Sequence, residues 1–126
     1  MKIKLRTLHS QFKGITGVYD SIFKFSRVVD LSEGYKEIKN MVELFEEKRK
    51  SLTPPMDDEG KMSVKDYTAF ENKLNDMLDE EITLKKPLKF TTEEAKAALE
   101  SRNITSSQFI ALEELFIVKT QPAEEK

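Results

Sequence analysis

The chain has 126 residues, with 21 lysines and arginines against 23 aspartates and glutamates, so its formal net charge is −2. This length suits one domain with a single core, and a hydrophobic content of 38% is too high for a disordered segment. Because the sequence has no cysteine and only one histidine, disulfide scaffolds, zinc fingers, iron–sulfur sites, thiol catalysis and multi-histidine metal sites within one chain are excluded.

Two further patterns bear on location. No run of about 18 apolar residues is present, so we expect no transmembrane helix. The first residues alternate charged and apolar side chains and lack the continuous apolar segment of a secretory signal. We therefore expect a cytoplasmic protein in a reducing compartment.

Residues 2–8 alternate between basic and apolar side chains, a period of two that predicts a short strand with a solvated face. From about Ser10 the apolar spacing changes to three and four, which predicts a helix reaching Val29. Gly14 and Gly17 weaken its first turns, so we expect either a later start or close packing at these glycines. The stripe consists of Ile15, Val18, Ile22, Phe25 and Val29.

A break is predicted over residues 30–33, where Asp30 or Ser32 can cap the next helix. That second helix is expected to run to Leu52, on the stripe Tyr35, Ile38, Val42, Phe45 and Leu52.

Two prolines and Gly60 predict a connection over residues 53–61. Ser63 with Asp66 is typical of a helix start, and the next helix should end at the acidic run 79–81. Its stripe consists of Tyr67, Phe70, Leu74, Met77 and Leu78. The second and third helices should form an antiparallel pair.

The last third of the chain contains shorter elements. Residues 82–90 are expected to be extended, as an edge or bent strand because of Pro87. Two capping boxes predict short helices, one from Thr91 to Asn103 and one from Thr105 to Leu115. Residues 116–118 can form a closing strand.

These elements together predict a single α+β domain over residues 1–120, followed by a polar tail over residues 121–126. Three amphipathic helices dominate it, as a helical hairpin plus an N-terminal helix. A small peripheral β element and short C-terminal helices complete the expected fold.

Two groups of residues are candidates for binding a partner. The N-terminal segment concentrates basic residues and can contact either an acidic protein or a phosphate backbone; its members are Lys2, Lys4, Arg6 and Lys13. The first helix is apolar nearly all round, so it is either central in the fold or covered by another chain, which makes Tyr19 and Phe23 candidates.

Signals for catalysis or metal binding are weak. Asp76, Asp79 and Glu80 cluster as in two-metal nucleases, but a solvated face is favoured in a chain with 23 acidic residues. His9 has no evident catalytic partner and is expected to be structural or on the surface. The acidic residues 57–59 before Gly60 lack the ligand alternation of a calcium loop. We expect no catalytic residue, metal or cofactor.

From Glu33 onward the order of features resembles a family of small tailed-bacteriophage proteins of unknown function. The matching features are a Lys/Glu-rich helix, an acidic turn before glycine, a second helix, an acidic run before a strand, and a Leu-Glu-x-Leu helix. In this sequence they are Lys36 to Lys50, residues 57–60, Tyr67 to Leu78, residues 79–82 and residues 112–115. The resemblance implies a phage or prophage origin and no established activity.

The sequence therefore favours a non-enzymatic protein-interaction module, either a virion or assembly component or a small inhibitor of a host protein. The first would self-associate or occupy a place in a particle, and the second would bind one host factor tightly. The alternative is a nucleic-acid-binding accessory protein that uses the basic N-terminal segment.

Overall fold

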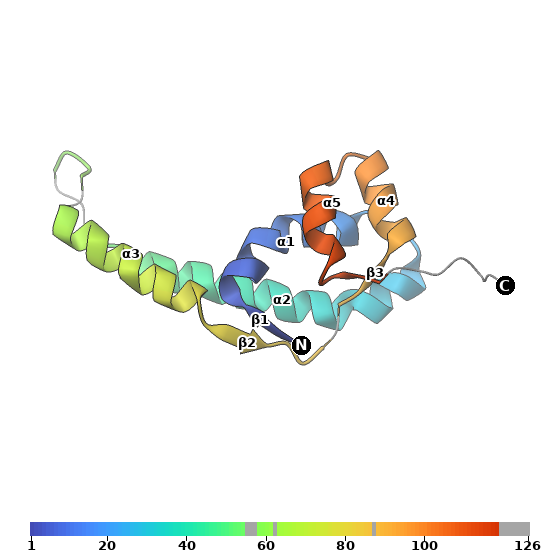
Figure 1. The fold of residues 1–126 in the computed structure, drawn as a ribbon, viewed down its shortest axis with the longest axis horizontal. Helices are drawn as coiled ribbons and strands as arrows, with labels where there is room; N and C mark the ends of the chain where they lie inside the picture. Colours follow the sequence, from blue (N-terminus) through green and yellow to red (C-terminus); the bar gives the residue numbers. More distant parts are fainter. Residues whose placement is uncertain (55–57, 62, 87, 119–126) are drawn as a thin grey trace.

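A computed structural model describes residues 1–54, 58–61, 63–86 and 88–118. The molecule is elongated along its longest helix, α2 (Phe25–Leu52), with a cluster of shorter helices on one part of it (Figure 1). Helices dominate and the strands are short, so the predicted α+β class is confirmed.

Helix α1 (Leu5–Asp20) is the centre of the fold, because it contacts α2 and also the shorter helices α4 (Thr92–Glu100) and α5 (Ser106–Glu113). Its buried side chains are Leu8, Ile15 and Val18. Central burial is therefore the reason for the apolar character of this helix as far as Val18.

The predicted strand over residues 2–8 is wrong beyond Lys4. Strand β1 covers only Lys2–Lys4, and α1 starts at Leu5. Leu5 fits both periods, because it continues the alternation with basic residues and also lies three residues before Leu8. Leu8 fits only the helical period, since it lies seven residues before Ile15. Leu8 is fully buried on the same face of α1 as Ile15, which agrees with the helical period.

The predicted break over residues 30–33 is also wrong, as is a first helix that continues to Val29. The chain turns at residues 21–24, and α2 is continuous through Leu31, which is buried. Ser21 holds the turn: its hydroxyl donates to the Gly17 carbonyl over 2.8 Å and accepts from Asn103 Nδ2 over 2.7 Å. Spacings of three and four happen to continue across this turn, which contains neither glycine nor proline.

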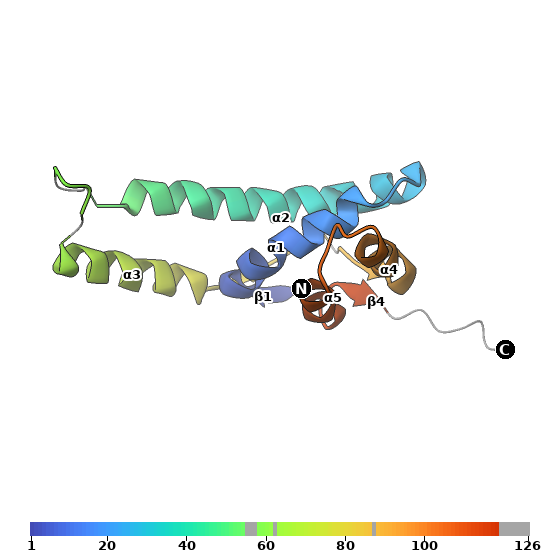
Figure 2. The ribbon, with the colours of Figure 1, turned by 90° about the horizontal axis from the view of Figure 1, so that it is seen from above.

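The helical hairpin is confirmed. Helix α3 (Val64–Leu78) runs antiparallel to the second half of α2, and the two lie side by side in Figure 2. Ser63 caps α3 by accepting a hydrogen bond from the Asp66 amide over 3.1 Å. Although α3 is amphipathic, none of its residues is buried. We call α3 and the second half of α2, residues 39–52, the arm.

The predicted single β element is instead two separate strand pairs. β1 pairs antiparallel with β2 (Glu81–Thr83), with Ile3 opposite Ile82. β3 (Phe90–Thr91) pairs in parallel with β4 (Ile117–Val118). The first pair ties the start of the chain to the end of α3, and the second closes the part that holds α4 and α5.

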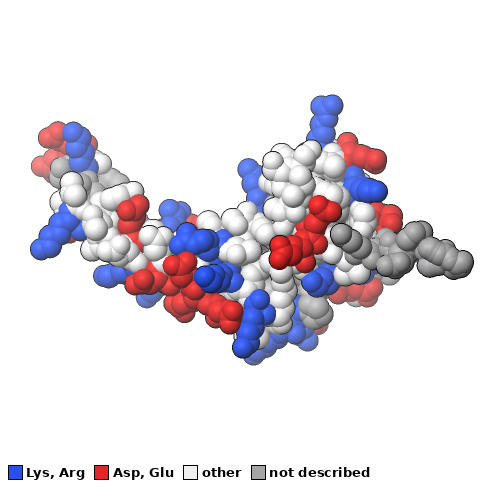
Figure 3. Space-filling model, viewed as in Figure 1, with Lys and Arg blue, Asp and Glu red and all other residues white. Residues whose placement is uncertain are grey.

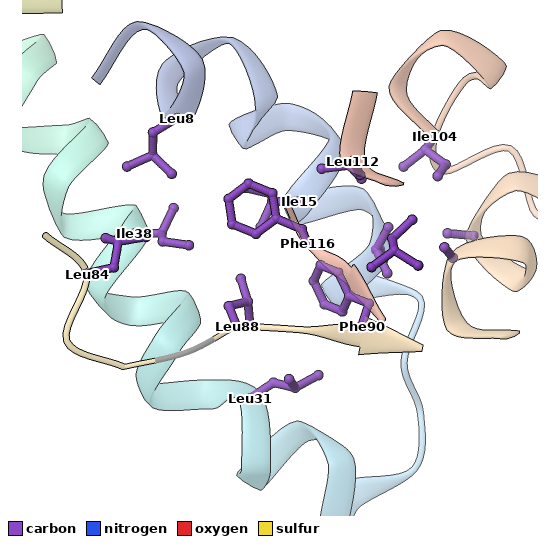
Figure 4. Close-up of a cluster of buried hydrophobic side chains, with 14 of the residues drawn as sticks. Leu8, Ile15, Leu31, Ile38, Leu84, Leu88, Phe90, Ile104, Leu112 and Phe116 are labelled. Atoms are coloured by element: carbon purple, nitrogen blue, oxygen red, sulfur yellow. The ribbon is translucent and has the colours of Figure 1, made fainter. Parts of the chain in front are cut away.

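The core lies where α1, α2, α4 and α5 meet, and its largest fully buried side chains include Phe90 and Phe116 (Figure 4). Both predicted capping boxes are present, at Thr91 and at Thr105. α4 ends at Glu100 and α5 at Glu113, each slightly before its predicted end. The predicted tail, residues 121–126, lies outside the described residues.

Candidate protein-interaction surfaces

The predicted basic segment is placed beside acidic residues. Arg6 Nε donates to Asp79 Oδ1 over 3.1 Å, and the β1–β2 register sets Lys4 opposite Glu81. In Figure 3, red side chains gather where α3 meets β2, with blue ones directly beside them. Lys2 is exposed at the start of β1. The segment is therefore part of a surface of mixed charge.

Lys13 is exposed but lies two turns further along α1 than Arg6, roughly 10 Å at 1.5 Å per residue. The structure thus groups Lys2, Lys4 and Arg6 at one end of the helix and leaves Lys13 apart from them.

The acidic cluster at the end of α3 serves as a partner for Arg6, since Asp79 accepts its hydrogen bond and Asn75 Oδ1 accepts a second over 3.2 Å. Asp76 and Glu80 are exposed. Within the part of the chain that the structure describes, no group of three or more histidine, aspartate or glutamate side chains is arranged to hold a metal ion.

His9 links α1 to α2. Its Nε2 lies 2.7 Å from Glu46 Oε2, and its ring packs edge-on against Phe45 with centroids 5.0 Å apart. Glu46 also accepts from Arg49 Nη2 over 2.6 Å. The hydrogen bonds from His9 and then Arg49 lower the pKa of the Glu46 carboxyl, so it stays ionised near neutral pH.

Tyr19 packs within the molecule. Its ring stacks on Tyr35 of α2 at 4.2 Å between centroids, and Tyr35 in turn stacks against Phe12 at 6.1 Å. Thr16 Oγ1 lies 3.1 Å from the Tyr35 hydroxyl. This aromatic stack holds α1 on α2, so Tyr19 belongs to the α1–α2 contact.

Phe23 lies in the turn between α1 and α2 and is 91% exposed. Phe25 is 76% exposed and Val29 is 53% exposed, so all three side chains around this turn are uncovered, and we call them the aromatic tip. The structure thus separates Phe23 from Tyr19. Sequence reasoning missed Phe25 and Val29 because it assigned them to the stripe of the first helix.

The aromatic tip is held firmly to the rest of the molecule. Arg27, in the first turn of α2, forms a two-point ion pair with Glu94 of α4, with Nε–Oε2 at 2.6 Å and Nη2–Oε1 at 2.9 Å. Arg27 Nη2 also donates to the Lys89 carbonyl. Such two-point pairs fix orientation as well as distance.

A second uncovered apolar surface lies on the arm. A cavity of about 190 Å³ opens between α2 and α3, and we call it the arm groove. Leu44 on its wall is 52% exposed. Its apolar lining is Leu5, Met41, Leu44, Phe45, Met77 and Ile82, and the exposed Lys48 and Glu80 also line it. Two helices alone cannot cover both of their apolar stripes, which leaves this groove open.

No known family model, curated protein or solved structure matches the chain. Among the residues that the structure describes, no helix has the length and apolar character needed to cross a bilayer.

Proposed function

We propose that this chain is a non-enzymatic protein-interaction module, encoded by a phage or prophage, that acts as an assembly component in the host cytoplasm or virion. The observation that carries the proposal is the pair of uncovered apolar surfaces, the aromatic tip and the arm groove. A ring as exposed as that of Phe23 is costly in water, and apolar patches of this kind mark contact sites with other proteins.

The apolar surfaces favour a protein partner over a nucleic acid. Aromatic and aliphatic anchors that enter pockets dominate protein interfaces. Nucleic-acid binding relies on a patch of positive charge that contacts the phosphates. Here Arg6 is paired with Asp79, and Lys4 lies opposite Glu81 on the neighbouring strand. These acidic neighbours favour a protein partner over the nucleic-acid alternative.

A non-enzymatic role fits the surroundings of the residues that could do chemistry. His9 is bonded to Glu46 and packed on Phe45, and Asp79 is bonded to Arg6. Each of these groups already joins two helices, which is a sufficient reason for its presence.

Site-specific photo-crosslinking tests the proposal. A photoreactive phenylalanine analogue is placed at Phe23, at Leu44 or at Lys36, an exposed residue of α2 outside both surfaces, in bacterial cells that produce the chain. We expect protein adducts from Phe23 and Leu44 and few from Lys36. Equal yields at all three positions, or none at Phe23 and Leu44, would contradict the proposal. Adducts to one host protein would instead favour the inhibitor over the assembly component.

A further inference from the structure

We propose that the arm groove of one copy receives the aromatic tip of a second copy, so that chains associate head to tail. This inference rests on the proposed function and names its partner, which is another molecule of this same chain. It joins the two uncovered apolar surfaces as the two halves of one contact.

The tip and the groove lie far apart on one rigid element. Phe25 begins α2, and the α2 residues that line the groove run from Met41 to Lys48. At 1.5 Å per residue these positions are separated by roughly 24–35 Å along the helix. Figure 2 shows the α1–α2 turn at one end of the molecule and α3 toward the other. A tip therefore cannot fill its own groove, and the contact must be intermolecular.

The size of the groove suits an aromatic ring. Its cavity of about 190 Å³ lies below the roughly 300–1,000 Å³ of pockets for drug-sized ligands. An apolar cavity of about 150 Å³ in another protein holds one benzene molecule. The groove thus has room for one phenyl ring, and its Leu, Met, Phe and Ile walls match that ring in chemistry.

The tip presents two such rings. Lys24 between them has extended backbone angles, φ −76° and ψ 111°. The two rings lie two residues apart in one turn, and both are mostly exposed. In the proposed contact Phe23, the more exposed of the two rings, enters the groove, and Phe25 lies against its wall.

Each of the two surfaces carries one acidic and one basic side chain. Asp20 and Lys24 are exposed beside the tip, and Lys48 and Glu80 are exposed at the groove. Across the described part of the chain, none of these four groups takes part in an ion pair. Each surface therefore offers one acid and one base for pairing across the contact, which sets its orientation.

A contact between different surfaces of identical chains is heterologous, so it closes into a ring or continues as an open chain. Each aromatic side chain buries about 150–250 Å². Two of them leave the contact below the ~1,200 Å² of standard stable interfaces, in the weak class. We therefore expect association that depends on concentration.

Sedimentation velocity on two variants and their mixture tests this contact. Phe23→Asp damages the tip and Leu44→Asp damages the groove, and both residues are exposed enough for the fold to tolerate the change. We expect the wild-type chain to associate, and each variant alone to sediment as a monomer with a mass of 14.6 kDa. Mixed, they should form a 1:1 complex of twice that mass, because one variant retains a groove and the other retains a tip. The control is Ile110→Asp, at an exposed position of α5, and this variant should associate like the wild type.

Other outcomes overturn the inference. If Phe23→Asp still dimerises while Leu44→Asp does not, two arms pack against each other in a symmetric contact. If the mixture stays at 14.6 kDa, the tip and the groove do not form one contact. A wild-type chain that stays monomeric at millimolar concentration also contradicts it. The proposed function would survive these results if crosslinks from Phe23 or Leu44 reach a different protein.

Discussion

Gly17 is the residue at which α1 meets the connection between α4 and α5. A Cβ atom added there would lie 2.5 Å from the Asn103 carbonyl oxygen and 2.6 Å from Ile104 Cγ2. The first of these is a backbone atom, which cannot move away as a side chain can. Close packing is thus the reason for this glycine, as one of the two sequence-based interpretations expected.

Gly17→Ala should therefore destabilise the protein. Overpacking costs about 1–3 kcal/mol, which exceeds the ~1 kcal/mol that alanine gains in helix propensity. Urea unfolding followed by circular dichroism measures the difference. Gly14→Ala is the matched control, because its nearest neighbours are side-chain atoms of Gln108 and Leu112 at 3.3 Å. A Gly17→Ala protein as stable as the wild type would show that α1 does not approach residue 103 this closely.

Glu94 combines two roles, as the third residue of α4, where it completes the capping box with Thr91, and as the partner of Arg27. Burial raises the pKa of its carboxyl, but hydrogen bonds from Arg27 and from Thr91 outweigh burial and lower the pKa overall. The hydrogen bond between Arg27 and Glu94 also raises the pKa of Arg27. A carboxyl whose pKa falls on folding stabilises the folded state above its unfolded pKa.

Glu94→Gln removes the charge and keeps an oxygen for the cap. We expect it to lower the free energy of unfolding by about 1–3 kcal/mol at neutral pH, since the pair is charged, doubly hydrogen-bonded and partly buried. The difference from wild type should stay constant above about pH 4.5, the ordinary pKa, and shrink as pH falls through the lower folded pKa. Urea unfolding at pH 7, 5 and 3 measures it.

The control for this comparison is Glu33→Gln. Glu33 pairs with Lys86 at 3.1 Å, but both side chains are more than half exposed, so the change should cost less than about 0.5 kcal/mol. If the loss of unfolding free energy in Glu94→Gln does not shrink at pH 3, then Glu94 stabilises the fold by its packing and not by its charge.

At the scale of elements, α3 differs from α1. Three side chains of α1 are fully buried, whereas α3 has no buried residue and faces an open groove. Local stability follows buried apolar contact, so α3 should open far more often than α1. Hydrogen exchange at low concentration should give α3 amides much weaker protection than α1 amides. Equal protection would mean that the hairpin is a cooperative part of the core.

Local rules predicted several elements well. Ser63, Thr91 and Thr105 mark helix starts because a side-chain oxygen within three residues satisfies an amide, whatever the rest of the fold does. The stripe from Tyr35 to Leu52 and the prolines after it likewise predicted the end of α2.

Long-range contacts decided what the sequence could not predict. The turn at residues 21–24 depends on Ser21 bonding Asn103, which lies 82 residues later. Leu5 fits both the strand period and the helix period, and the burial of Leu8 accompanies the helix. The arm groove depends on how far α3 stands from α2, which neither stripe specifies. Of the site residues, Phe23 was foreseen as apolar, but its exposure follows from that turn.

The whole molecule is a compact part with an arm (Figures 1 and 2), and the aromatic tip and the arm groove lie at different places along α2. Arg27 and Glu94 fix the tip, and the paired strands β1 and β2 fix the base of the arm. The tip is thus held on a fixed frame, whereas one wall of the groove is the less protected helix α3. A preformed surface loses less entropy on binding, which favours specific assembly.

The mass of the wild-type chain in solution is the most direct test of an assembly role. Light scattering is measured from micromolar to millimolar concentration at two salt levels. We expect a mass that rises with concentration from 14.6 kDa and is little changed by salt, because apolar burial drives the contact. A mass that stays at 14.6 kDa over the whole range would contradict self-assembly.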